Sequence, residues 1–94
     1  MNVFWLPRAL RRLEQVRDYT DVDNPTAAIQ TVRRIFECAE RLSRFPEIGR
    51  KGTVAGTRQF AVPGTPFLLI YRVRRNQIEI LTVLHGARKW PDLV

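Results

Sequence analysis

The sequence predicts an α+β domain in which two helices precede most of a sheet. Through much of the first half of the chain, apolar residues recur at the spacing of one buried helix face. In the second half, short alternating or β-branched runs are separated by turns rich in glycine and proline. The links between these runs are short, which favours antiparallel pairing. We therefore expect the order β-α-α-β-β-β over residues 1–94, an antiparallel sheet with an N-terminal helical hairpin packed on one face.

The N-terminal half begins with a short strand and continues as two helices. Val3 and Trp5 alternate with other residues in a β-prone run that ends at Pro7. The first helix carries a stripe of residues that share one face, namely Ala9, Leu10, Leu13, Val16 and Tyr19. Asn24 followed by Pro25 indicates an N-cap with proline at the first helical position. The second helix then shows a longer stripe of the same kind, made of Ala28, Ile29, Val32, Ile35, Phe36, Ala39 and Leu42.

The C-terminal half reads as three strands joined by short links. The expected elements are, in order, a Gly-rich connection at 49–57, a strand at 58–62, a turn at 63–66, a strand at 67–74, a tight hairpin at 75–77 and a central strand at 78–84. One face of the middle strand is apolar throughout. Its other face is apolar first, at Leu68 and Ile70, and basic later, at Arg72 and Arg74. The sheet is therefore expected to present a basic surface near its hairpin.

The positive charge lies in the C-terminal half. Sixteen Lys and Arg stand against nine Asp and Glu, giving a net charge of +7. Residues 1–49 contribute +1 (eight arginines, seven acids), whereas residues 50–94 contribute +6 (eight basic residues, two acids). Most of the basic residues are arginine, whose planar fork pairs bidentately with phosphate and carboxylate. Such a surface favours nucleic acid or an acidic protein partner, and a merely solvated face is the alternative.

Few residues of the chain are suited to catalysis. The single His85, at the end of the last strand, is the candidate general base, because an ordinary imidazole titrates near about pH 6.5. The alternative is a histidine that ends a strand and bonds a backbone carbonyl. Cys38, the one cysteine, is interpreted as a packed side chain. No phosphate-loop or metal-ligand pattern is present, so we expect no cofactor and no metal. Without a signal-peptide pattern or an apolar run of about 20 residues, we expect a cytoplasmic protein with no membrane contact.

Three motifs in the second half form a specific combination. They are PGTP at 63–66, IYRV at 70–73 and VLHGAR at 83–88, preceded by the Gly-rich run at 49–58 and followed by Trp90-Pro91. With this combination the whole chain closely resembles the RelE/ParE superfamily of type II toxins. The resemblance implies a small antiparallel sheet with a helical hairpin. It also implies a cognate antitoxin that wraps and neutralises the toxin in a hetero-oligomer, as in plasmid stabilisation systems.

The resemblance implies one of two activities. RelE-like members cut mRNA in the ribosomal A site, whereas ParE-like members inhibit DNA gyrase. The two lysines of the RelE pattern fall here at Gln59 and Ala61, and an arginine of that pattern falls at Leu68. Its terminal tyrosine has no counterpart, and only the arginine after the last strand is kept, as Arg88. The resemblance therefore favours a ParE-like growth inhibitor that poisons gyrase without chemistry of its own.

Site residues follow from these expectations. The residues expected to contact the target, which is gyrase with or without its bound DNA, are Arg72, Arg74, Arg88, Lys89 and Trp90. Those expected to contact the antitoxin are Leu10, Leu13 and Arg58. The alternative is a ribosome-dependent mRNA endonuclease with a relocated site built on His85, Arg72 and Arg88. A third hypothesis is a chain that has lost toxicity and survives as a binding partner. This third hypothesis predicts that expression without antitoxin is harmless, whereas growth arrest would exclude it.

Overall fold

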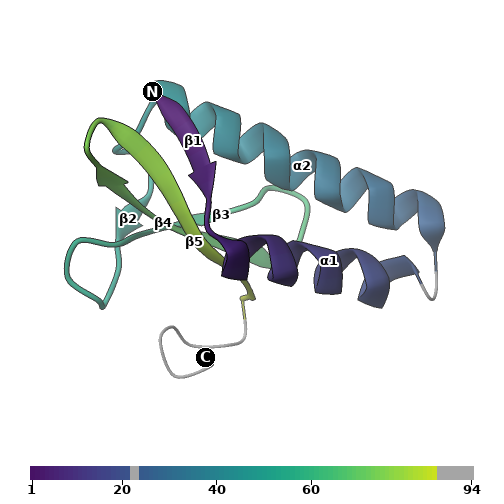
Figure 1. The fold of residues 1–94 in the computed structure, drawn as a ribbon. Coiled ribbons are helices and arrows are strands. Elements are labelled where there is room, and N and C mark those ends of the chain that lie inside the picture. Colours follow the sequence, from purple (N-terminus) through teal and green to yellow (C-terminus); the bar gives the residue numbers. More distant parts are fainter. Residues whose placement is uncertain (22–23, 87–94) are drawn as a thin grey trace.

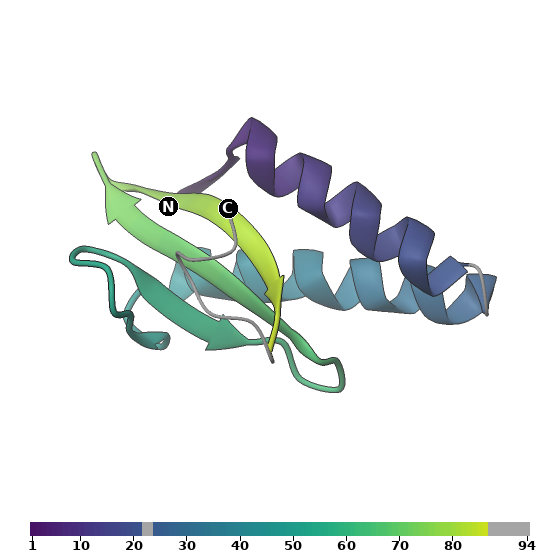
Figure 2. The same cartoon turned by 90° about the horizontal axis from the view of Figure 1, so that it is seen from below.

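The two helices form an antiparallel hairpin on one face of a mixed sheet (Figures 1 and 2). The computed structural model describes residues 1–21 and 24–86. Within them the elements are β1 (Asn2–Trp5), α1 (Pro7–Asp21), α2 (Pro25–Arg44), β2 (Arg50–Lys51), β3 (Arg58–Ala61), β4 (Phe67–Arg74) and β5 (Gln77–His85). Helix α1 packs against α2 and β5, and α2 packs against β1 and β5. The predicted α+β architecture is thus confirmed.

The sheet differs from the predicted one at its two edges. The strand order is β1-β5-β4-β3-β2, and β2 to β5 pair antiparallel in sequence order, as expected. Strand β1, however, pairs parallel with β5, so the sheet is mixed rather than wholly antiparallel. A parallel neighbour requires a long crossover, and the helical hairpin is part of it. The second edge strand, β2, lies within the segment expected to be only a connection.

Helix α2 begins where its sequence predicts. Asn24 is the N-cap, its side-chain oxygen accepts a hydrogen bond from the backbone N–H of Ala27 at 3.1 Å, and Pro25 follows at the start of the helix. At the other end, the N–H of Phe45 donates to the carbonyl of Arg41 at 2.9 Å. The cap at Asn24 confirms the predicted start of the second helix.

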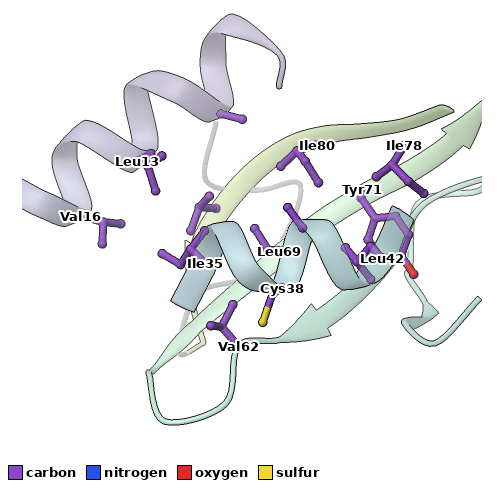
Figure 3. Packing of buried hydrophobic residues seen from close by; sticks show 13 residues of the cluster. Leu13, Val16, Ile35, Cys38, Leu42, Val62, Leu69, Tyr71, Ile78 and Ile80 are labelled. Carbon is purple, nitrogen blue, oxygen red and sulfur yellow. The ribbon is translucent and has the colours of Figure 1, made fainter. Parts of the chain in front are cut away.

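The core lies between the helices and the sheet (Figure 3). Its members come from α1, α2 and alternate positions of the strands, and include Leu13, Val16, Ile35, Cys38, Leu42, Val62, Leu69, Tyr71, Ile78 and Ile80. Burial raises the pKa of the Cys38 thiol, as expected for the packed side chain that the sequence suggests. Tyr71 is fully buried, but its hydroxyl donates to the carbonyl of Pro46 at 2.8 Å and accepts from the N–H of Gly49 at 3.0 Å. The tyrosine thereby holds the α2–β2 connection against the sheet.

Strand β5 contains a bulge that the sequence pattern did not indicate. Ile70 of β4 pairs with Thr82, but the next residue, Tyr71, pairs with Ile80, so Leu81 is an extra residue on β5. Leu81 and Thr82 therefore turn toward the same face. Beyond the bulge the alternation is reversed, which explains how Ile80 and Val83 both reach the core beneath the helices.

Candidate functional site

The face of the sheet that points away from the helices, here called the outer face, changes character along β4. Its positions alternate with the core positions and are Gln59 and Ala61 of β3, Leu68, Ile70, Arg72 and Arg74 of β4, and Glu79, Leu81, Thr82 and Leu84 of β5. At one end, Ile70, Leu81 and Leu84 form a buried apolar cluster. At the hairpin end the outer face is basic. Both halves of the sequence expectation for this face are thus observed.

Arg72 and Glu79 form a cross-strand ion pair at the hairpin end. They are partners in the β4–β5 register, and Nε of Arg72 donates to Oε1 of Glu79 at 2.5 Å. Their side chains are 35% and 14% exposed, respectively. The hydrogen bond from Arg72 lowers the pKa of Glu79, so this group is a carboxylate at neutral pH. The bond uses Nε, which leaves the two terminal Nη groups of the guanidinium as further donors.

The hairpin that follows is tight and basic. Arg74 is exposed on the outer face, and Arg75 and Asn76 form the turn with φ of 53° and 61°. Two consecutive residues in the left-handed region are typical of the turn that joins antiparallel strands through two residues. The predicted hairpin is confirmed, and it places Arg74 and Arg75 next to each other at an exposed tip.

A hollow of about 530 Å³ lies beside the ion pair. Arginines from two elements line it, Arg8 from the start of α1 and Arg72 and Arg74 from β4, together with Leu6, Leu81 and the loop at 54–57. We call it the arginine hollow. Arg8 was not predicted as a site residue, because it lies in the first turn of α1, 59 residues before the start of β4 in the chain. In the sequence, Arg8 is marked as a surface residue only by its position outside the apolar stripe of the first helix.

Three positions of the RelE-like catalytic pattern, 59, 61 and 68, lie close together on the outer face but carry no charge. Ala61 pairs with Leu68 across β3 and β4, and Gln59 pairs with Ile70 on the same face. The fold thus brings these positions together, as a shared catalytic face requires. In this chain they hold an amide, a methyl group and an isobutyl group, none of which transfers protons at neutral pH or supplies positive charge.

His85 lies at the opposite end of the β4–β5 hairpin. Its ring meets Phe67 edge to face, with centroids 5.8 Å apart and planes at 82°. The two line a pocket of about 330 Å³ with Arg12, Gln15 and Val16 of α1, on the helix side of the sheet. Arg72 lies five residues from Phe67 along β4, roughly 16 Å at the rise of a strand, and on the other face. The structure therefore does not bring His85 and Arg72 into one site.

The remaining residues expected to contact the target belong to the C-terminal segment. Arg88, Lys89 and Trp90 lie outside the described residues. Within residues 1–21 and 24–86, no three His, Cys, Asp or Glu side chains gather as a metal site would require. The same part of the chain contains no helix that is long and apolar enough to span a bilayer.

The three residues expected at the antitoxin surface have different environments. Leu10 is 44% exposed on α1. Leu13, by contrast, is 7% exposed and belongs to the core, because it lies on the helix face that meets the sheet. Arg58 donates from Nη1 to the carbonyls of Gly49 at 2.8 Å and Glu47 at 3.4 Å, which ties down the α2–β2 connection. Of the three, Leu10 alone is an exposed apolar side chain.

Two apolar side chains of α2 were expected in its buried stripe but are exposed. Ile29 is 60% exposed and Phe36 is 42% exposed, seven residues apart and so on one side of the helix. The ring of Phe36 packs against Trp5 of β1 at 5.1 Å between centroids. Leu10, Ile29 and Phe36 are the large exposed apolar side chains of the two helices as described, and we call these three residues the helical-hairpin surface.

Comparison with known proteins gives a consistent group of relatives. The family model for the ParE toxin of the type II toxin–antitoxin system, parDE, matches residues 3–90. Y4kP of Sinorhizobium fredii, which is named as a toxin, is 38% identical over 99% of this chain and 96% of its own length. Toxin RelE2 of Caulobacter vibrioides is 34% identical over 93% of this chain and 97% of its own length. A chain of the solved chromosomal ParDE system from P. aeruginosa superposes with a TM-score of 0.83 at 27% identity, over 90% of this chain and 95% of that one.

These matches, together with the helical hairpin on a curled sheet, define a toxin of the RelE/ParE superfamily. The chain belongs to the ParE toxin family of type II toxin–antitoxin systems. Such a toxin has an antitoxin as its partner. The names of the relatives include both ParE and RelE, so the cellular target has to be argued from the residues of this chain.

Proposed function

We propose that this toxin inhibits growth by poisoning DNA gyrase through direct contact and that a cognate antitoxin neutralises it. The observation that carries the proposal is the outer face itself. Where the RelE-like pattern requires basic catalytic groups, this chain has Gln59 and Ala61 on one face of β3, with Leu68 of β4 paired to Ala61. Removing general acid–base groups costs about 10²-fold or more each, so a nuclease that lacked three of them would be very slow.

The separation of the remaining candidates supports the same conclusion. Proton transfer requires the base within about 3 Å of the reacting hydroxyl, and the group that stabilises the developing charge must be equally close. His85 and Arg72 are on opposite faces and at opposite ends of β4 and β5. A basic surface whose neighbouring carboxylate, Glu79, is already engaged by Arg72 is suited to binding rather than to cleavage.

A supercoiling assay tests the target. Purified gyrase is given relaxed plasmid with and without antitoxin-free toxin, and the products are denatured to reveal trapped cleaved DNA. Inhibition with linear product is the expected result. If a folded toxin leaves supercoiling unchanged, the gyrase proposal is wrong.

The same antitoxin-free toxin can also be tested against the alternative target, the ribosome. One relative carries the name RelE2, which keeps an mRNA endonuclease as the second candidate. Translating ribosomes programmed with a defined mRNA would then yield toxin-dependent cleavage, and His85→Gln would abolish it. We expect no cleavage above background.

For the antitoxin we propose the helical-hairpin surface as the contact. Leu10, Ile29 and Phe36 are large apolar side chains left exposed on the hairpin, and burying such groups drives stable association. The net charge of the whole chain, +7, favours an acidic, amphipathic segment. Phe36→Ala is expected to weaken antitoxin binding by about tenfold or more. Ile48→Ala, which truncates an equally exposed apolar residue outside the hairpin, is the matched control and should have little effect.

A further inference from the structure

We propose that the arginine hollow binds backbone phosphate groups of duplex DNA, with Arg8, Arg72 and Arg74 as the donors. The inference rests on the proposed function, because gyrase acts on DNA, and it names the ligand of the basic surface. It adds Arg8, a residue from the other end of the sequence, to the two arginines of β4.

The geometry of Arg72 suits a phosphate ligand. Glu79 accepts from Nε at 2.5 Å and is itself largely buried, so the guanidinium plane is fixed from one edge. The Nη groups then form the fork that pairs bidentately with phosphate oxygens. Because the orientation is set before binding, less side-chain entropy is lost when the ligand arrives.

The charge around the hollow exceeds what its own carboxylate compensates. Glu79 is the one acidic residue among residues 50–86, against six Lys and Arg in that range. Arg74 and Arg75 extend the positive charge to the exposed hairpin tip. A polyanion that releases condensed counterions on binding is the ligand that such a concentration of arginine favours.

The position of the arginines in the sheet favours DNA over an acidic peptide. Arg72 and Arg74 lie two residues apart on one face of β4, about 6.7 Å along the strand. Strand β4 is central, and its backbone pairs with β3 and β5 on its two sides. An extended peptide therefore finds no open strand edge there to add to, which is how such peptides gain main-chain hydrogen bonds. A ligand held through its charged groups alone, as a DNA backbone is, does not need one.

The walls of the arginine hollow also leave room for a DNA backbone to approach. Gly56, in the loop at 54–57, has a φ of 80°, and a Cβ added there would meet no atom within 4 Å. The loop thus presents open space on the solvent side rather than a packed side chain. Leu6 and Leu81, which also line the hollow, offer apolar contact to the sugar of a nucleotide.

The test is direct binding of the full-length, antitoxin-free toxin to a short fluorescent DNA duplex, measured by anisotropy over a series of salt concentrations. Arg72→Ala and Arg74→Ala should each weaken binding by about tenfold, the factor expected for one charged hydrogen bond. Each should also reduce the slope of log affinity against log salt by about 0.9, the value for one phosphate contact. Arg8→Ala should act in the same direction. Arg72→Lys, which keeps the charge but not the fork, should fall between wild type and Arg72→Ala.

Arg33→Ala is the matched control, because it removes the same charge from an exposed position on α2, on the other side of the sheet. It should leave affinity and slope nearly unchanged. The proposal is overturned if Arg33→Ala weakens binding as much as Arg72→Ala, or if the duplex does not bind. It is also overturned if single-stranded RNA or a Glu-rich peptide binds more tightly than the duplex through the same arginines. Thermal melting of each variant confirms that it is folded.

The two proposals fail in different ways. If the wild type inhibits gyrase but Arg72→Ala and Arg74→Ala leave DNA affinity unchanged, the phosphate site is wrong and the gyrase target stands. If the duplex binds as expected but supercoiling is unaffected, the gyrase target is wrong and the phosphate site stands.

Discussion

The two ends of the β4–β5 hairpin differ in chemistry although the same two strands form both. The tip end holds Arg72, Glu79, Arg74 and the turn, with an ion pair on the outer face. The other end, where β4 begins and β5 ends, holds Phe67 and His85 in an edge-to-face contact on the helix side of the sheet. One end thus offers fixed positive charge to a ligand, and the other offers an aromatic pocket beneath α1.

This difference matters because the two candidate functions need different ends. A gyrase or DNA contact needs exposed positive charge, which the tip end provides. A nuclease needs His85 and an arginine within one site, and the alternation of the strands directs His85 and Arg72 to opposite faces. Substitutions at the two ends should therefore have separable effects.

The largest effect is expected from the double change Arg72→Ala with Arg74→Ala at the tip end. Two charged hydrogen bonds are lost at about tenfold each, so gyrase inhibition should fall by about 100-fold. His85→Gln, at the other end of the hairpin, should retain gyrase inhibition. The measurement is the toxin concentration that halves supercoiling.

A control for lost charge is Arg33→Ala with Arg44→Ala on α2, where both arginines are exposed. It should leave inhibition close to that of the wild type. The comparison of the two ends breaks down if His85→Gln is the inactive variant and the tip variant is active.

Tyr71→Phe should have the next largest effect, on stability rather than on binding. It removes the partner of the Pro46 carbonyl and of the Gly49 N–H, and both bonds lie at a fully buried side chain. Buried groups left without partners cost about 1–3 kcal/mol each, so the free energy of unfolding should drop by about 2–3 kcal/mol. Urea unfolding measures the loss. DNA affinity below the melting temperature should not change, and a parallel loss of affinity would show that the tip depends on this anchor.

Thr82→Val should act in the opposite direction. Thr82 is fully buried on the outer face beside the bulge, and its hydroxyl has no hydrogen-bond partner among the residues that the structure describes. Valine keeps the shape and removes the unsatisfied group, so stability should rise by about 1 kcal/mol in urea unfolding. A loss of stability instead would mean that the hydroxyl has a partner in solution.

Most of the fold follows from local patterns in the sequence. The Asn24 cap, the helix stripes and the tight hairpin at Arg75 each depend on neighbours in the chain, and each was predicted. The parallel pairing of β1 with β5 was not, because strand patterns carry no information on which distant strand lies alongside. The bulge at Leu81 was also missed, since a continuous run of β-branched and apolar residues looks the same with or without one extra residue.

The site was predictable where its residues share one strand. The basic end of β4 could be read from alternation alone, which gave Arg72 and Arg74. Arg8 lies at the start of α1, far from β4 in the sequence, and only the fold brings it to the same hollow as Arg72 and Arg74. Conversely, the spacing placed Leu13 in the apolar stripe of the first helix, and the packing of α1 on the sheet buries it there, although it was also expected at the antitoxin surface.

The smallest effect is expected from Glu79→Gln, and it should depend on pH. Because the hydrogen bond from Arg72 lowers the pKa of Glu79 in the folded state, the pair stabilises the fold most at pH values above the ordinary glutamate pKa of about 4.3. This contribution is lost as the pH falls through the lowered folded-state pKa, where the carboxylate is protonated. Wild type should therefore be slightly more stable than Glu79→Gln at neutral pH, and the two unfolding curves should converge in acid. A difference that persists unchanged at acid pH would show that the amide disturbs packing, and that the charge of Glu79 does not hold Arg72 in place.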